Sequence, residues 1–536
     1  MSDPAPRLAD TVTIDEPIAP GAPWILSVRG VPRARVGPAV ATFAAGLRPS
    51  AHETDETDET DETEGTGSTS LTDEETAALL REFATAGLLA GSERREPRSH
   101  RLQFRPPASL QLTLLDATRP ALVLARLLRR RPVRLLAVTA VVAVLLLGTA
   151  SAIAHSAEIA AVLSEPLPLP SLLAVSVAFL LAGAVHEAGH AVSLAAFGGR
   201  PRRAGLMIFY LAPAFFCDVT DGWRLGDRRS RAAVALAGPA VHLVLAASAA
   251  TALLWAPTGR SALACFVVAA ALSAVTNLIP LVHLDGYLAL VAVLDRPFLR
   301  RAAIRAVGDS ALRLLGGTAP RTSPWLVLFG VGCRGFALLL IGWAYVRSVP
   351  VLILTEPGAV IALVFAAALL GALVVSLVRF ARAAREARVG ALRVAVASAV
   401  LAAALAGVAA LPLEERIEGG YVVRNGEAFL VRTSADPRIV PGTPVRLTSN
   451  GIAVRSPRST AVVSGPAESL LAPIAALAPL TGLDDVPAVG YPLALPDSAS
   501  TPPVGGASVS LGVGTIGGAV LDLVAGDALR RLGVGR

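Results

Sequence analysis

The sequence predicts a mainly α-helical, multi-pass membrane protein of about seven transmembrane helices, with a small N-terminal winged-helix-like α+β unit and a C-terminal β domain. Three observations predict this class. Of the 536 residues, 53% are hydrophobic, and the mean hydropathy of +0.60 is too high for a soluble chain of this size. Apolar stretches of about 20 residues recur between residues 135 and 411. The flanking segments are more polar, and their residue patterns predict short strands and helices.

Residues 1–100 form the first expected unit. Residues 24–28 and 33–36 have the pattern of short strands, and residues 37–47 that of a short helix. Thr72-Asp-Glu-Glu75 begins a capped helix that runs through Phe83. This order is winged-helix-like. Residues 53–64 are a Thr-Asp-Glu repeat of period three, and such a run of one charge sign is typical of a disordered, solvated insert.

Residues 101–411 are the expected transmembrane domain. Windows of about 20 apolar residues give seven spans. They are residues 135–153, 171–197, 232–255, 262–279, 325–346, 351–378 and 394–411. The fourth span is short and ends at Pro280, as expected of a helix that breaks to present the Asp285 that follows.

The charge distribution predicts the orientation. All 48 basic residues are arginine, and the formal net charge is +7. Arginines cluster before span one, between spans two and three, after span four, and between spans six and seven. The positive-inside rule therefore predicts a bacterial cell-membrane protein with a cytoplasmic N-terminus and an extracytoplasmic C-terminus. A basic nucleic-acid-binding surface is the competing interpretation, but this alternation disfavours it, and no nucleic-acid partner is expected.

The second span contains the motif His186-Glu187-Ala-Gly-His190. Histidines at i and i+4 share one helix face, where both imidazoles can hold one zinc ion, and Glu187 is placed to act as a general base. The same pattern can be an ordinary charged face of a soluble helix. In lipid, however, these side chains are costly without partners, so a functional site is the default interpretation. Asp285, between Pro280 and Gly286, offers a carboxylate as the third ligand.

On these two motifs the chain resembles the site-2 protease clan of intramembrane zinc metalloproteases. Residues 205–213, 218–223 and 231–239 resemble its bacterial peptide zinc metalloprotease branch, and the resemblance covers roughly residues 110–303. It implies a Zn²⁺ cofactor bound by His186, His190 and Asp285. It also implies that Glu187 is catalytic and activates water, and that Asn277 helps to bind substrate.

The implied function is hydrolysis of peptide bonds in a membrane-associated or ribosomally synthesised peptide substrate, such as leader removal in peptide natural-product maturation. Peptide-biosynthesis or export proteins are possible partners beside the lipid bilayer. Two alternatives stay open: regulated intramembrane proteolysis of a membrane-bound regulator, and a non-proteolytic peptide export or immunity protein. No PDZ-like segment interrupts the loops, which favours peptide processing.

With residues 86–89 included, the N-terminal unit resembles the PqqD-like domains that bind leader peptides. The acidic repeat, however, stands where a middle helix is expected. Leader recognition and a merely structural cap are therefore both kept as interpretations of this unit.

The expected mechanism is metal-assisted peptide hydrolysis. Zinc held by two neutral imidazoles and one carboxylate keeps a fourth position open and lowers the pKa of bound water toward ~7. Glu187 takes the proton of that water and returns it to the leaving amine. A helical substrate hides its carbonyls, so it must unwind, and Asn277 with the broken backbone around Pro280 is expected to pair with the extended segment.

Residues 412–536 predict an extracytoplasmic β-rich domain with a flexible tail. Residues 421–431 and 445–455 each carry an Asn-Gly pair between apolar runs, which predicts two hairpins. Residues 457–536 are rich in Pro, Gly, Ser and Ala. The spacing of the three cysteines predicts no disulfide framework.

Several polar residues elsewhere are open to more than one interpretation. His242 and His283 are each open to two interpretations, an orienting role at the metal site and an isolated polar residue facing other helices. The isolated role is favoured for His242, and neither role is favoured for His283. Arg334 is expected to face protein or water. Asp218 and Asp221 match family positions, and their carboxylates are also suited to capping a turn.

Overall fold

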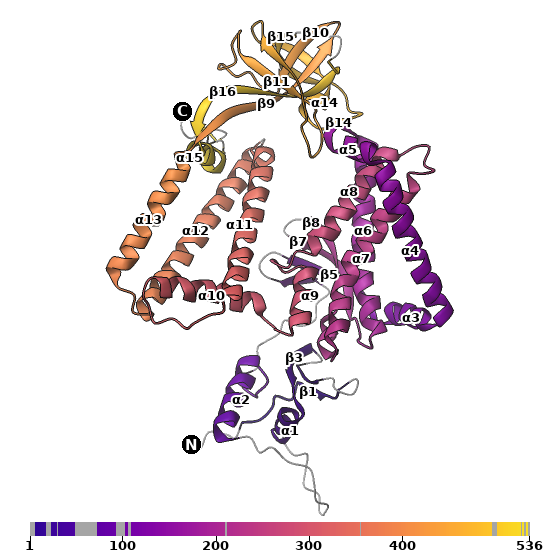
Figure 1. The fold of residues 1–536 in the computed structure, drawn as a ribbon, viewed down its shortest axis with the longest axis vertical. Helices are drawn as coiled ribbons and strands as arrows, with labels where there is room; N and C mark the ends of the chain where they lie inside the picture. Colours follow the sequence, from indigo (N-terminus) through magenta and orange to yellow (C-terminus); the bar gives the residue numbers. More distant parts are fainter. Residues whose placement is uncertain are drawn as a thin grey trace, which may run out of the picture.

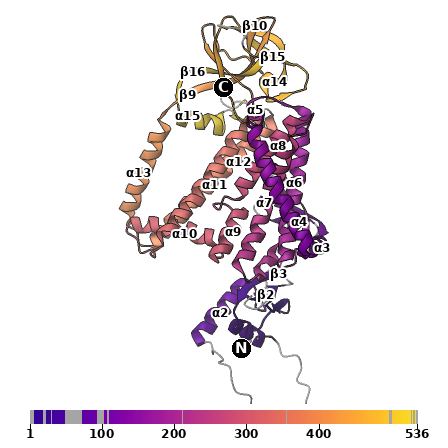
Figure 2. The same ribbon diagram turned by 45° about the vertical axis from the view of Figure 1, so that its right-hand side comes forward.

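The computed structural model describes most of the chain, in eleven stretches: residues 6–17, 23–28, 31–48, 72–92, 102–105, 109–209, 212–353, 355–495, 501–526, 528–529 and 532–533. The expected acidic insert, residues 53–64, lies outside the described residues. Three parts follow one another along the long axis of the molecule (Figures 1 and 2). The N-terminal unit is at one end, the long helices are in the middle, and a β barrel is at the other end.

The N-terminal unit is a three-stranded antiparallel sheet with two helices. The elements are β1 (Val12–Asp15), β2 (Trp24–Val28), β3 (Val31–Val36), α1 (Pro38–Gly46) and α2 (Asp73–Ala86), and the sheet order is β1-β2-β3. The sequence predicts all of these except β1. At the start of α2, the Thr72 hydroxyl accepts the N–H of Glu75, and the Glu75 carboxylate accepts the N–H of Thr72. The hydrogen bonds from Thr72 hold the pKa of Glu75 below its ordinary value.

Seven helices among the described residues are long and apolar enough to cross a membrane, as the sequence predicts. They are α4 (Arg131–Ala154), α6 (Leu169–Ala196), α7 (Arg228–Ala252), α8 (Arg260–Asn277), α11 (Pro324–Leu352), α12 (Glu356–Glu386) and α13 (Ala391–Ala409). Half of the apolar window of α7 is buried, against 22% or less in each of the other six. The α7 helix is therefore the central one, and it packs against α4, α6, α8 and α9 (Asp285–Leu294).

Shorter helices lie at the two ends of the spans. Figure 1 places α3 (Thr118–Arg129) and α10 (Leu299–Leu314) at the end that faces the N-terminal unit, and α5 (Ser156–Ser164) at the end that faces the barrel. Both α3 and α10 carry several arginines. Arginine is thus concentrated at the same end of the helical region as the N-terminal unit.

A second sheet, which the sequence does not predict, lies beside α6. It consists of β4 (Leu102–Arg105), β5 (Ser109–Asp116), β7 (Arg203–Phe209) and β8 (Ala212–Cys217), in the order β4-β5-β7-β8 with all neighbours antiparallel. The strand β8 is at the edge of the described sheet and packs against α6. The strands β4 and β5, which precede the first span in sequence, therefore extend the β7–β8 hairpin. That hairpin lies in sequence between the second and third spans.

The predicted C-terminal β domain is a closed barrel. Six antiparallel strands run in the order β10-β9-β16-β11-β12-β15, and pairing of β10 with β15 closes the circle. The strands are β9 (Pro412–Arg424), β10 (Glu427–Arg432), β11 (Pro444–Thr448), β12 (Pro457–Val463), β15 (Val486–Ala494) and β16 (Val504–Thr515). Tyr421, Leu430, Leu447 and Val509 are fully buried within it, so side chains fill the interior.

Two details of this domain differ from the sequence expectation. The first hairpin forms, with Asn425 and Gly426 both at positive φ in the turn. A second hairpin forms between β11 and β12, but its predicted Asn-Gly turn and second strand are wrong, because residues 449–456 connect the two strands. The side chain of Asn450 is buried and donates to the carbonyl of Ala475 at 2.7 Å. The sequence indicates a flexible tail from residue 457, whereas the described part of that segment supplies three barrel strands and β13 (Glu468–Ala472), which pairs with β15.

The barrel is attached to the connection between α5 and α6. The N–H groups of Ala453 and Val454 donate to the Leu163 carbonyl, and the Arg458 guanidinium pairs with Glu165 at 2.8 Å. The short strand β14 (Leu480–Thr481) pairs in parallel with β6 (Leu167–Pro168), directly before α6 begins. The barrel is thus fixed to the end of the helix that carries the histidine motif.

Candidate metal centre

Two of the three predicted ligands come from the C-terminal half of α6. His186 and His190 are one helical turn apart and point to the same side, and they are only 8% and 6% exposed. Both lie within a long apolar helix, so their polar ring nitrogens have no bulk water to contact.

The third predicted ligand comes from a break between two helices. The α8 helix ends at Asn277, and α9 begins at Asp285 after a turn that contains Pro280. The residue after the aspartate must be glycine, because a Cβ at Gly286 would collide with the backbone of Leu278. This close approach folds the turn back on the end of α8 and directs Asp285 toward α6.

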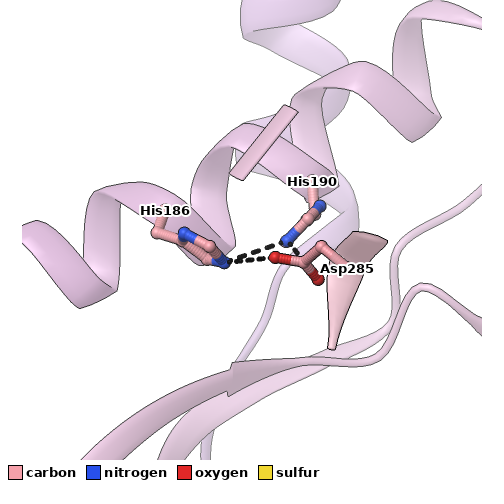
Figure 3. A group of neighbouring side chains, drawn as sticks. All are labelled: His186, His190 and Asp285. Atoms are coloured by element: carbon pink, nitrogen blue, oxygen red, sulfur yellow. Dashed lines mark hydrogen bonds and ion pairs between the residues drawn. The ribbon is translucent and has the colours of Figure 1, made fainter. Parts of the chain in front are cut away.

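The three side chains converge on one point (Figure 3). The Nε2 atoms of His186 and His190 are 3.2 Å apart, and the Asp285 carboxylate oxygens lie 3.1 Å from the first and 3.4 Å from the second. Zinc bonds of about 2.0–2.1 Å in tetrahedral geometry place neighbouring ligand atoms ~3.3 Å apart. The triangle therefore has the size that a tetrahedral metal ion requires.

The hydrogen bonds around the triangle also fit a cation. Nδ1 of His190 donates to the Val234 carbonyl at 2.7 Å, which leaves its Nε2 with a lone pair directed at the centre. Oδ2 of Asp285 is buried and accepts no hydrogen bond from the described residues. Electron-rich atoms at this spacing repel one another unless a cation lies between them. The three residues could thus hold a metal ion.

The central helix α7 forms one wall of this centre. Val234 and Gly238 are one turn apart, so the carbonyl that fixes His190 and the glycine lie on the same face. A Cβ at Gly238 would collide with the Nε2 atoms of both histidines. The absence of a side chain at this position therefore makes the room in which the two rings converge.

The carboxylate of Glu187 is held beside the centre by β8. Its Oε2 accepts the backbone N–H of Cys217 at 2.8 Å, and it interacts electrostatically with both histidines and Asp285. The next N–H along the chain, that of Asp218, donates to Arg203 on the β7 side. Because successive N–H groups alternate in direction, the free edge of β8 faces α6 and Glu187.

The other residues that the sequence analysis names as candidates have hydrogen-bond or ring partners outside the three candidate ligands. The Asn277 amide donates to the Ser273 carbonyl at 3.0 Å, and its described contacts do not include the three candidate ligands. The His283 ring is exposed and packs edge-on against Tyr287, with centroids 4.8 Å apart. Asp221 accepts the N–H of Arg200, which is a turn-capping role.

Asp218 accepts the N–H of Thr220 two residues on and so caps its own turn, whereas Asp221 caps backbone 21 residues away in sequence. The side chain of Arg334 is exposed on α11, and its neighbours along that helix are mostly apolar residues.

Sequence reasoning misses two parts of this centre, the Val234 carbonyl and the N–H of Cys217, and it disfavours a part for the ring of His242. The first two are backbone groups, which carry no sequence signal. His242 is interpreted from the sequence as an isolated polar residue, but its ring centroid lies 4.9 Å from that of His186. Its spacing of four residues from Gly238 is the signal that places it on the same helix face.

No protein-family model, curated protein or solved structure matches this chain. The function has to be argued from the site itself.

The close packing at Gly238 gives a direct test of this geometry. Gly238→Ala should weaken zinc binding by about tenfold or more, the scale seen when groups that support a metal ligand are changed, because the added methyl displaces both imidazoles. Zinc affinity is measured by chelator competition on protein in detergent. The matched control is Gly371→Ala in α12, where an added Cβ meets nothing within 4 Å. Equal affinity in wild type and Gly238→Ala would contradict the described packing.

Proposed function

We propose that this chain is an intramembrane zinc metallopeptidase of the site-2 protease type, acting on a membrane-associated or ribosomally synthesised peptide. The observation that carries the proposal is the position of Glu187. Its carboxylate is fixed beside two histidines and an aspartate that could hold one metal ion. Two histidines at i and i+4 with an intervening glutamate are the set that zinc peptidases use, and a centre with three protein ligands keeps one position open for chemistry.

The proposed orientation follows the arginines. The N-terminal unit and the arginine-bearing helices α3 and α10 lie at one end of the spans, and the barrel lies at the other (Figure 1). By the positive-inside rule, the first end is cytoplasmic and the barrel is outside a bacterial cell membrane. His190 is six residues before the end of α6 at Ala196, or about 9 Å along the helix. Water therefore has its shorter path to the site from the cytoplasm.

Each residue of the centre has a defined part in hydrolysis. A divalent ion held there supplies Lewis acidity, which polarises a carbonyl and makes water a stronger acid. Because Oε2 of Glu187 is occupied by the Cys217 N–H, Oε1 is the oxygen that takes a proton from water and passes it to the leaving amine. Val234 holds His190 in the tautomer that leaves Nε2 unprotonated.

The substrate is proposed to bind as an extended strand along β8. This strand has a described partner only on its β7 side, and its other edge faces Glu187. Phe215, two residues before Cys217, presents its backbone groups to the same edge. Strand addition here would pair the substrate backbone and expose a carbonyl to the site, which a helical peptide cannot do. Asn277, at the end of α8, is a candidate contact on the opposite side.

The N-terminal unit is proposed to be a winged-helix-like, PqqD-like module that recognises the peptide. Two ion pairs attach it next to the site: Arg35 with Asp295 at 3.4 Å, and Asp15 with Arg224 at 3.8 Å. Asp295 ends the α9 helix that Asp285 begins. A leader held by this unit would thus lie one short helix away from the candidate metal ligand, which favours peptide maturation over release of a membrane-bound regulator.

Glu187→Gln tests the catalytic role. The variant should bind zinc as the wild type does, because no candidate ligand is removed, and should lose activity by about a hundred- to ten-thousandfold, because the proton acceptor is gone. Products from a mixture of membrane-inserted peptides are identified by mass spectrometry, and zinc is measured on the same samples. The control is Glu158→Gln at the barrel end, where Glu158 pairs with Arg260. Full activity in Glu187→Gln would exclude it as the general base.

Deletion of the N-terminal unit tests peptide recognition. A variant without residues 1–100 keeps β4 and therefore the whole second sheet. Its KM for a peptide encoded beside the gene should be about tenfold or more above that of the wild type. A tenfold increase corresponds to ~1.4 kcal/mol of lost binding free energy. A variant without residues 53–64 should keep the wild-type KM. Zinc content reports whether the membrane domain remains intact. If both deletions leave KM unchanged, the unit is a structural cap.

A further inference from the structure

His242 lies on the face of α7 that forms the wall of the metal centre. Val234, Gly238 and His242 are spaced by four residues, so they lie one above another on that face. The first holds His190 and the second makes room for both rings. His242 is only 4% exposed, although it is a polar residue in an apolar helix. A buried imidazole in this position calls for a physical explanation.

The two candidate histidine ligands are held unequally. Nδ1 of His190 donates to the Val234 carbonyl. Nδ1 of His186 is buried, and it has no hydrogen-bond partner among the described residues. Histidines that bind metal through Nε2 almost always donate the other ring N–H to an acceptor, which fixes the ring orientation. Among the described residues, the Nδ1–H of His186 therefore lacks an acceptor.

The ring of His242 is in the right place to supply that acceptor. Its centroid lies 4.9 Å from that of His186, with the ring planes inclined by 50°. A hydrogen bond between two imidazoles, with about 2.9 Å between nitrogens and about 1.1 Å from each nitrogen to its ring centre, gives centroids ~5 Å apart. Nδ1 of His242 is itself buried and without a partner in the described part of the chain. Two adjacent rings therefore each carry a buried nitrogen without a partner among the described residues.

The His242 ring also packs against an aromatic residue. The Phe179 ring stacks on it at 5.9 Å with an interplanar angle of 24°. This aromatic contact covers one face of the imidazole and packs it in the interior.

We infer that His242 is a positioning residue for the metal centre, whose neutral ring accepts the Nδ1–H of His186, directly or through one water molecule. His186 is then held with Nε2 directed at the ion, as Val234 holds His190. This inference rests on the proposed metal centre but not on peptide hydrolysis.

The test compares two substitutions at position 242 by metal binding rather than by activity. His242→Leu removes the acceptor and keeps an apolar side chain, and it should weaken zinc affinity by about ten- to a hundredfold. His242→Gln keeps an acceptor oxygen and should stay within a few-fold of the wild type. The visible absorption spectrum of the cobalt-substituted protein should change in the leucine variant and be largely preserved in the glutamine variant.

His283→Leu is the matched control, since the His283 ring packs on Tyr287 and should not alter zinc affinity. Wild-type affinity in His242→Leu would overturn the inference. Equal losses in the leucine and glutamine variants, or failure of both to fold, would also overturn it, because only packing would then matter. If the expected difference is found in a protein without peptidase activity, the proposed function fails and the role of His242 stands.

Discussion

Two imidazoles and a carboxylate face one another inside a bundle of apolar helices, and the rest of the structure depends on that constraint. An aspartate at the centre of a membrane helix costs about 3 kcal/mol on insertion scales, and histidines there also need partners. Their ligand atoms lie only 3.1 to 3.4 Å apart, so the three polar groups share one small space. A bound cation would satisfy all three groups at once, and the three residues could hold one. The geometry thus explains why a metal ion fits.

Each element around this centre either makes room for one of its groups or holds one of them in place. The break between α8 and α9 brings a carboxylate into a helical region without an exposed backbone, because Gly286 lets the turn pack on Leu278. The central helix α7 supplies space at Gly238 and an acceptor at Val234. The edge of β8 fixes Glu187, and among the described residues this edge has no neighbouring strand. The same elements that satisfy the buried polar groups therefore also shape the proposed substrate path.

Much of this arrangement could be predicted from the sequence, because it is encoded locally. The seven spans follow from runs of apolar residues, and the pairing of His186 with His190 follows from helical periodicity. The remainder depends on contacts between distant segments. The sheet beside α6 joins residues about ninety positions apart, and the Val234 carbonyl has no side chain to reveal it. Asn450 has the sequence of a turn, yet it is buried and bonds to Ala475, because packing within the C-terminal domain outweighs the local turn preference.

Metal analysis of the purified protein and of two ligand variants tests the central claim most directly. We expect about one zinc ion per chain in the wild type and loss of that zinc in both His186→Ala and Asp285→Ala. The two variants remove ligands from different helices, so a common loss requires that α6 and α9 share one ion. Undiminished zinc in both variants would contradict the assignment of the ligands. Iron in place of zinc would contradict the hydrolytic role, because two histidines and one carboxylate also serve iron-dependent oxidation.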